Sequence, residues 1–498
     1  MRRLGRLRFR RTTLLIVLYA AFLIGVGQAS QGRGVNSEWL WLLGGLLPVF
    51  RRRTVVTLVL IVLLGFGLGL WRGGLFADRL AAYLPFYEQK ITLTAQAMND
   101  GIYGKGGQMS FDANHVRLED GTELVGKIQL SGFGLNSVYQ GDEIVAAGKL
   151  FPGFGAYQGR MSYAQLGLIE HHPSLVAEIR RRFAAGVGSA LPEPAASFTM
   201  GLLIGQRATL PQSTKDDLTR VGLTHIIAVS GYNLTIILRA SRGLLAKNSK
   251  RLATALSVVL IGCFLLLTGS SASIVRAAIV SMLSIAAGYY GRDFRPLGLI
   301  LLAAAITAWA NPLYVWSDLS WYLSFLAFYG VMALAPALNV RLRQGRGLPL
   351  PAAVALESLA AEATTLPYVL YKFGQMSFVG LVANVLVTTA VPLAMLLGTA
   401  AGLAGMLLGP LAGWMAWPAR LLLTYMLDVA RVLSGVPHGF TEDIGFSRNQ
   451  MLVTYGAVIA VTVVMQFKTR PKNDTITDKN KYQAEEQAFE RTQQVVNN

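Results

Sequence analysis

Four polar or small residues interrupt an apolar stretch near the middle of this 498-residue chain: His225, Ser230, Gly231 and Asn233. A histidine and a serine this close together raise the question of nucleophilic catalysis. A nucleophile elbow would read Gly-x-Ser-x-Gly, and the residues around Ser230 do not. The nearest acidic residues, at 216–217, lie in a polar stretch and make no convincing third member of a triad. The pattern therefore argues against a catalytic site.

Two other interpretations of this segment remain open on the residues alone. Polar groups in an apolar run can line a water-filled path through a membrane. Gly231 would permit a close approach of two backbones or a break in a helix. Small residues such as Ser230 and Gly231 are equally typical of helix packing in membranes, and His225 could be a buried histidine with a satisfied partner.

Two charged residues stand at other apolar segments. Arg276 lies within the apolar run 274–285, and an arginine inside a membrane segment is a functional candidate by default. It is also close to the start of its run, so its side chain could instead extend to the lipid headgroups. Asp318 begins another apolar segment, where the common role of an aspartate is to cap a helix.

Several kinds of chemistry are disfavoured by what the sequence lacks. Its single cysteine, Cys263, can form no intramolecular disulfide and no cysteine-rich metal site. Its five histidines include no His-Glu-x-x-His motif, and no Gly-x-x-x-x-Gly-Lys-Ser/Thr loop is present. We therefore expect no metal and no cofactor, and no nucleotide-driven motor of that type within the chain.

The composition predicts the elements that must position these residues. The chain is 53% hydrophobic and 14% charged, whereas soluble domains carry about 25% charged residues. Several apolar runs approach the length of a spanning helix, which favours a helical bundle over a membrane β-barrel. We predict a polytopic α-helical membrane protein. The clearest runs are 14–29, 55–70, 252–267, 297–310 and 452–466.

Residues 88–172 have a different character, with short strand-like runs separated by glycines. Asp120-Gly121 predicts a hairpin turn, and residues 144–150 predict another strand. A small β-rich domain, similar to an OB barrel, fits this pattern. It could contact nucleic acid or serve as a structural cap without a ligand. The basic residues that would make the contact are Lys105, Lys127, Lys149 and Arg160.

The basic residues also predict the orientation of the chain. The net charge is +18, which fits either retention of cytoplasmic loops or an acidic partner such as nucleic acid. Basic clusters alternate with neutral turns, so we expect the β-rich domain outside and the C-terminus in the cytoplasm. The expected domains are 1–72, N-terminal transmembrane helices; 88–172, extracellular β domain; 173–467, transmembrane domain; and 468–498, disordered cytoplasmic tail.

The segment 222–233, GLTHIIAVSGYN, resembles the signature of the ComEC family, the DNA-uptake channel proteins of natural competence. That signature is roughly Gly-x-x-His, two apolar residues, Ala, one apolar residue, Ser-Gly-x and His or Asn. Further stretches resemble other blocks of the family in the same order along the chain. They are 201–207, 271–277, 311–312, 318–325, 373–375, and Asn384 followed by Pro392.

The resemblance implies a channel that carries single-stranded DNA across the cytoplasmic membrane during transformation. It implies single-stranded DNA and membrane lipids as partners, with a separate DNA receptor outside and a motor ATPase in the cytoplasm. It leaves the oligomeric state open. The residues it assigns to the DNA path are His225, Ser230, Gly231, Asn233, Arg276, Asp318, Ser324 and Asn384.

The chain departs from the family pattern at one important point. Many members carry a metallo-β-lactamase-like domain proposed to degrade the strand that does not enter, but the His-x-His-x-Asp-His motif is absent here. We therefore expect a translocation channel without metal-dependent nuclease activity, not an enzyme. The alternative is a polytopic transporter of another anionic solute or a lipid-linked glycan. Such a transporter often has inverted repeats, and none is clear in the sequence.

Overall fold

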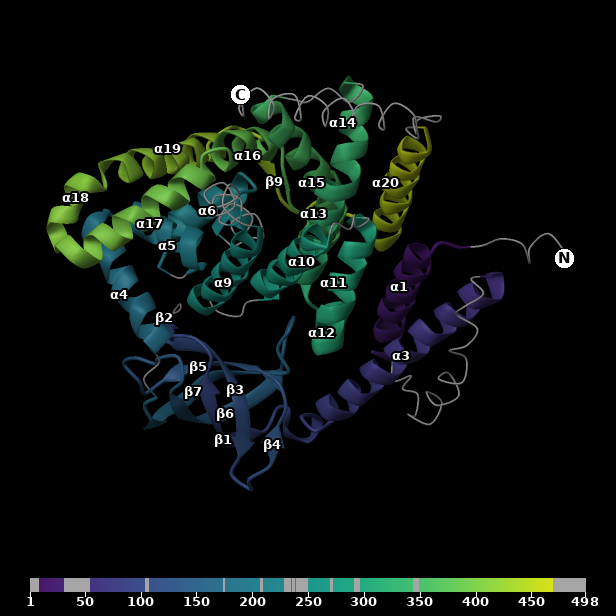
Figure 1. Ribbon diagram of the computed structural model, residues 1–498. Helices are drawn as coiled ribbons and strands as arrows, with labels where there is room; N and C mark the ends of the chain where they lie inside the picture. The colour runs from purple at the N-terminus through teal and green to yellow at the C-terminus, as the bar shows by residue number, and fades with distance from the viewer. Residues whose placement is uncertain are drawn as a thin grey trace, which may run out of the picture.

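The computed structural model has two parts, a bundle of helices and a small β domain attached to one end of it (Figure 1). It confirms the predicted fold class of a polytopic helical protein with a β-rich domain. The structure describes residues 9–30, 54–103, 107–172, 175–206, 209–227, 234, 238, 250–268, 272–290, 296–343 and 349–468.

Within the described residues, four helices are long and apolar enough to cross a membrane by length and composition. They are α1 (Arg11–Ala29), the stretch Val55–Phe86 that contains α3 (Val55–Ala81), the stretch Leu319–Arg341 that begins with α13 (Leu319–Tyr329), and α17 (Val391–Leu408). Shorter apolar helices accompany them: α5 (Ala195–Ile204), α9 (Lys250–Thr268), α10 (Ala272–Tyr289) and α11 (Pro296–Ala310).

Further helices complete the described part of the chain, and the apolar run predicted at 452–466 lies in the last of them. Their order along the chain determines which segments meet at the candidate site. They are α4 (Leu175–Ala190), α6 (Gln212–Arg220), α7 (Thr224–Ile227), α12 (Leu313–Trp316), α14 (Ala335–Arg343), α15 (Leu350–Phe373), α16 (Gly380–Thr388), α18 (Ala412–Met415), α19 (Trp417–Ser434) and α20 (Arg448–Lys468).

Helices α1 and α3 cross at glycines. A methyl group added at Gly69 would lie 2.2 Å from the carbonyl oxygen of Phe22, and one at Gly25 would lie 2.2 Å from that of Phe66. No side chain larger than hydrogen fits at these positions. Because lipid offers no hydrophobic drive for helix association, such close backbone contact is what holds two apolar helices together.

The β domain is a small closed barrel. Its sheet has the order β1-β6-β7-β5-β3, and a further pairing of β1 with β3 closes it. β5 and β7 run parallel, whereas the other paired strands are antiparallel. A five-stranded Greek-key barrel is the architecture of OB-like domains. The strands are β1 (Lys90–Ala97), β2 (Ile102–Tyr103), β3 (Met109–Leu118), β4 (Glu123–Leu124), β5 (Ile128–Phe133), β6 (Glu143–Pro152) and β7 (Gly159–Glu170).

The local predictions for this domain are confirmed. Gly121 has a φ of +83° in the turn that joins β3 to β4, as expected of an Asp-Gly hairpin. The predicted strand 144–150 forms most of β6. Alternate residues of the strands fill the barrel, as Ile144, Leu130 and Met161 illustrate.

Helix α4 connects the β domain to the bundle. At its start, Arg180 and Arg181 lie 3.4 and 3.9 Å from the carboxylate of Asp100 in the β domain. At its other end, Gly186 packs against Gly405 of α17 so closely that a methyl group on Gly405 would lie 1.9 Å from the Gly186 carbonyl oxygen. The barrel is therefore fixed to the helices by contacts at both ends of α4.

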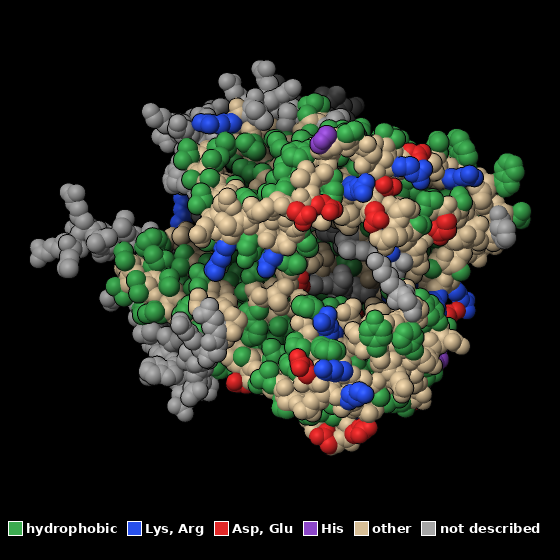
Figure 2. Space-filling view, turned by 180° about the vertical axis from the view of Figure 1, so that it is seen from behind, with side chains coloured by type: hydrophobic (Ala, Val, Ile, Leu, Met, Phe, Trp, Pro, Cys, Tyr) green, Lys and Arg blue, Asp and Glu red, His purple; other side chains and the backbone are tan. Residues whose placement is uncertain are grey.

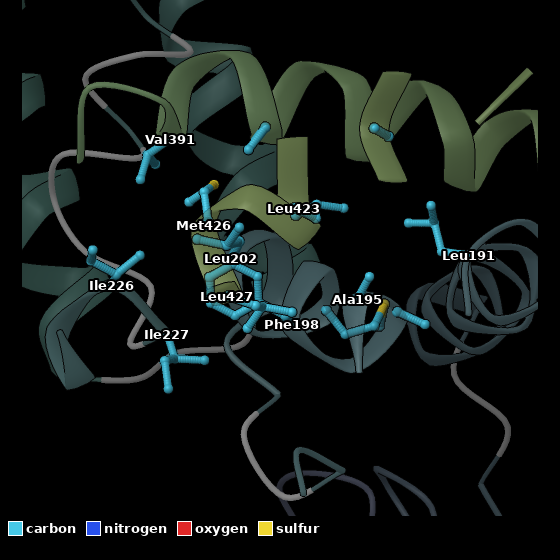
Figure 3. Close-up of a cluster of buried hydrophobic side chains, with 14 of the residues drawn as sticks. Leu191, Ala195, Phe198, Leu202, Ile226, Ile227, Val391, Leu423, Met426 and Leu427 are labelled. Carbon is cyan, nitrogen blue, oxygen red and sulfur yellow. The ribbon is translucent and has the colours of Figure 1, made fainter. Parts of the chain in front are cut away.

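A cluster of buried apolar side chains joins helices that are far apart in sequence (Figure 3). Phe198 and Leu202 of α5 lie beside Met426 and Leu427 of α19, and Ile226 of α7 lies at the edge of the same cluster. α7 has only four residues and could not be stable alone. This packing is what holds it, and the histidine within it, in place.

Candidate functional site

The signature segment is only partly described by the structure. Ser230, Gly231 and Asn233 lie outside the described residues, so their predicted place on a path stays a prediction. His225 lies in α7, and its Nδ1 is 3.0 Å from the carbonyl oxygen of Gly222. Because a carbonyl can only accept, Nδ1 is the donor and carries the proton.

His225 also meets another of the predicted residues. Its side chain hydrogen-bonds Asn384 of α16, and the Thr388 hydroxyl donates to the Asn384 side-chain oxygen. The structure thus brings together two residues that the sequence places in separate blocks. They form a small polar cluster beside the apolar core that holds α7.

Arg276 is fully buried in α10, with 0% of its surface exposed. Its Nη2 donates to the carbonyl oxygen of Ser320 at 2.9 Å, while Nε and Nη1 have no hydrogen-bond partner among the described residues. The ring of Phe325 lies 6.0 Å from the guanidinium carbon. This burial rules out the interpretation that Arg276 extends to the lipid headgroups. Burying a cation whose hydrogen-bond donors have no partners costs free energy, unless an anion pairs with it.

The structure confirms the prediction that Asp318 caps a helix. Its carboxylate accepts a hydrogen bond from the backbone N–H of Trp321 at 3.2 Å, at the start of α13. It interacts electrostatically with Arg276, yet no ion pair joins Arg276 to a carboxylate among the described residues. Ser324, half-buried, lies one turn after Ser320 on α13 and so on the same side of that helix.

The basic residues predicted on the β domain have aromatic partners, apart from Lys105, which lies outside the described residues. These basic residues were identified from the sequence as candidate contacts, but their aromatic partners were not. The available signal was the group of aromatic residues close to Lys149 and Arg160 in sequence: Phe151, Phe154, Tyr157 and Tyr163. The pairs are Lys127 with Tyr157 at 4.5 Å, Lys149 with Phe151 at 5.3 Å, and Arg160 with Phe154 at 4.7 Å and Phe151 at 5.7 Å.

The loop between β6 and β7 contacts the helices next to Asp318. The Ser317 hydroxyl donates to the carbonyl oxygen of Gly155 at 2.6 Å. The Tyr157 hydroxyl donates to Asp112 Oδ2 at 2.9 Å. Burial raises the pKa of Tyr157, and the charges of Asp112 and Asp318 raise it further. This part of the β domain therefore lies close to the end of α13 that neighbours Arg276.

The molecular surface is hollowed between the β domain and the helices (Figure 2). Lysine and arginine side chains lie on the rim of this hollow, together with some acidic side chains. Hydrophobic side chains lie on the rim beside the charged ones. A hydrated, charged solute could approach the bundle at this place.

One group of side chains in the described part of the chain has atoms that could coordinate a cation. The ligand atoms of Glu143, Glu170 and His172 lie within 4.8 Å of one another at the end of the sheet. These side chains are mostly exposed, and nothing else there points to a metal. The neighbouring His171 hydrogen-bonds the buried Asp142 at 2.6 Å, which anchors the end of the barrel.

These features define a class: a polytopic membrane protein whose helices enclose polar residues and whose small β-barrel is fixed beside them. The family model described as competence protein matches residues 202–468, which is more than half of the 498-residue chain. The chain therefore belongs to the competence protein family. The matched range contains His225, Arg276, Asp318 and Asn384 but not the β domain.

One curated relative is similar to part of this chain. ComE operon protein 3 of Bacillus subtilis (strain 168) is 22% identical over 229 residues, which cover 46% of this chain and 29% of that protein. The chain thus matches less than a third of the length of that relative. No solved structure was found to match.

Proposed function

We propose that this chain forms the path by which single-stranded DNA crosses the cytoplasmic membrane during natural transformation. Membership of the competence family supports a role in DNA uptake. The apolar helices support a path through a membrane, and the adjoining β domain supports a first contact with DNA on the outer side.

The observation that carries the proposal is the buried guanidinium of Arg276. Each nucleotide of a single strand brings a negative phosphate, which is very costly to expose to hydrocarbon. Within the part of the chain that the structure describes, Arg276 offers two donors without partners inside the bundle, beside the helix end that contacts the β domain. Hydrogen bonds between an ionised donor and an anion are shorter and stronger than neutral ones. A passing phosphate is therefore the partner this site lacks.

The other predicted residues complete the proposed path. His225 and Asn384 supply a polar cluster further along the bundle, and Ser230, Gly231 and Asn233 are proposed to line the adjoining segment. A separate receptor would deliver DNA on the outer side. A separate motor ATPase in the cytoplasm would draw it in, because the sequence contains no Gly-x-x-x-x-Gly-Lys-Ser/Thr loop. In this proposal the chain translocates DNA and does not cleave it.

The test is uptake of labelled DNA by cells that carry Arg276→Gln, normalised to the amount of protein in the membrane. Losing one charged hydrogen bond to phosphate costs about 1.5–3 kcal/mol, which corresponds to a fall of about tenfold or more. Arg276→Lys keeps the charge and should retain much of the uptake. Because Gln removes an unpaired buried charge, the stability of the purified protein should be unchanged or higher.

A matched control is Arg72→Gln. Arg72 of α3 donates from Nε to the carbonyl oxygen of Trp309 at 2.9 Å and from Nη2 to that of Ala310 at 3.3 Å, at the C-terminal end of α11. These two hydrogen bonds hold the end of a helix, so the loss of Arg72 should lower stability and leave uptake per molecule unchanged. Normal uptake per molecule in Arg276→Gln would contradict the proposed phosphate contact.

A further inference from the structure

One tyrosine of the β domain is displayed to solvent by an irregularity in strand β7. Tyr163 has a φ of +58° and 75% of its surface is exposed. The pairing of β7 with β5 shifts between Leu130 and Gly132, and its pairing with β6 shifts between Ala147 and Lys149. A β-bulge of this kind turns a side chain out of the regular alternation. A positive φ at a bulky residue is costly, and it persists only where the surroundings enforce it.

The neighbouring strands are shaped to accept this bulge. On β5, a methyl group at Gly132 would lie 2.1 Å from the carbonyl oxygen of Ala164. On β6, a methyl group at Gly148 would lie 3.0 Å from the sulfur of Met161. Glycines on both sides of β7 therefore leave room for the irregular backbone, and the outward position of Tyr163 is fixed by the fold.

The β domain has further rings that are at least partly exposed, and one of them lies beside Tyr163. The ring of Phe133 is 6.4 Å from that of Tyr163, and Phe133 is 46% exposed. Phe154 is 69% exposed and lies under the guanidinium of Arg160. Ser162, next to Tyr163, pairs with Lys149 across the strands. We call this set the aromatic face: Phe133, Phe151, Phe154 and Tyr163, with the cations Lys149 and Arg160.

We propose that the aromatic face is a stacking platform for the bases of single-stranded DNA, with Lys149 and Arg160 contacting the phosphates between them. This inference rests on the proposed function and names how its outer contact works. A single strand offers unpaired base faces, and aromatic rings beside a basic track bind them without sequence preference. In a duplex the base faces are stacked on one another, so a duplex would contact only Lys149 and Arg160.

The extent and polarity of the face suit a short stretch of nucleic acid better than a lipid surface. From Arg160 to Gln165, which pairs with Phe133, strand β7 covers roughly 17 Å. That length accommodates about four nucleotides, at the lower end of OB-fold site sizes. Gln129 and Gln165 are exposed on the same strands. Their amides could pair with base edges but would be poorly placed against acyl chains.

The test uses the full chain in phosphatidylcholine nanodiscs and three labelled probes: a 20-nucleotide oligo-dT, an abasic 20-mer with the same phosphates, and a 20-base-pair duplex. The wild type should bind oligo-dT about tenfold more tightly than the abasic strand or the duplex. Tyr163→Asn should remove most of that difference and leave abasic binding unchanged. Asparagine tolerates a positive φ, so the variant should fold.

Two control variants sharpen the comparison. Tyr163→Phe keeps the ring and should bind oligo-dT within about twofold of the wild type, since the stacking face is retained. Lys149→Ala should weaken the binding of oligo-dT and of the abasic strand alike, because both carry the same phosphates.

Equal binding of oligo-dT and abasic DNA by the wild type would overturn the platform while leaving the proposed path for DNA in place. An unchanged oligo-dT affinity in Tyr163→Asn would overturn it too. The proposed function itself is judged separately, by the uptake of DNA in cells carrying Arg276→Gln.

Discussion

Two arginines of this chain show how the surroundings of a residue decide its role. Arg72 and Arg276 both lie in apolar helices, and both donate to a backbone carbonyl oxygen. The described hydrogen bonds of Arg72 go to carbonyl oxygens at the end of a helix, which is a structural role. Arg276 is fully buried, and two of its nitrogens have no hydrogen-bond partner in the described part of the chain. Only the second arrangement leaves donors for an anion.

A prediction at the same scale concerns the buried carboxyl group of Asp112. Burial raises its pKa, although the hydrogen bond from Tyr157 and the charge of Lys127 act in the opposite direction. A raised pKa means that the fold favours the protonated form. The stability this gives is present at acid pH and is lost as the pH rises through the raised pKa.

Asp112→Asn keeps an acceptor for Tyr157 and removes the charge, so it should stabilise the β domain at pH 7 and have little effect at acid pH. Hydrogen exchange of strands β3 and β5 in the full chain measures this. Asp120 is the control: its pKa is lowered, first by the hydrogen bond from the Thr122 backbone, so Asp120→Asn should give no gain at pH 7. Equal effects of the two substitutions would contradict the reasoning.

At the scale of elements, glycine contacts and one connecting helix hold the molecule together. α1 meets α3 at glycines, and α4 meets α17 in the same way. α4 also carries the arginines that bind the β domain through Asp100. A movement of the bundle at α17 would therefore be passed to the barrel through α4.

The crossing of α1 and α3 gives a prediction about stability. Gly69→Ala places a methyl group 2.2 Å from the Phe22 carbonyl oxygen, and overpacking of this kind costs about 1–3 kcal/mol. Membrane abundance and the melting temperature of the purified protein should fall. Gly262→Ala in α9 is the control, because no atom of the described residues lies within 4 Å of the added methyl group. There the better helix propensity of alanine should leave stability equal or slightly higher. A tolerated Gly69→Ala would show that the helices can separate without cost.

At the scale of the whole molecule, the β domain lies at one end of the bundle, and its β6–β7 loop touches the helices near Arg276 (Figure 1). In the proposed function, incoming DNA contacts the aromatic face first and the buried Arg276 second. The order requires the barrel to be on the outer side of the membrane, which the alternating basic clusters of the sequence also predict.

Cysteine labelling tests this orientation. In a chain with Cys263→Ser, a cysteine at the exposed Asn136 of the β domain should react with a membrane-impermeant thiol reagent in intact cells. A cysteine at Lys479 should react only after the membrane is permeabilised. Labelling of position 479 alone in intact cells would show that the orientation is inverted and would remove the outer DNA contact from the proposal.

Much of the architecture followed from the sequence because it depends on local chemistry. The apolar runs 14–29 and 55–70 lie in helices long and apolar enough to cross a membrane, because hydrocarbon accepts few polar groups. The runs 252–267 and 297–310 form shorter apolar helices, and two further candidate spans, Leu319–Arg341 and Val391–Leu408, were not among the clearest runs. The Asp120-Gly121 turn lay where the hairpin was expected. The segment 222–233 pointed to the competence family, and the family match over residues 202–468 agrees. The cap at Asp318 was also readable, because it involves only the next three residues.

Contacts between distant segments were decided by the tertiary structure. No local pattern reveals that His225 meets Asn384, that the described residues leave two donors of the buried Arg276 unpaired, or that Gly132 and Gly148 make room for Tyr163. Composition and spacing determine which elements form, because each depends on a few neighbouring residues. Which side chains then share a cavity, a strained bulge or a free hydrogen-bond donor depends on how the packed elements fit together, and that is settled only when the whole chain folds.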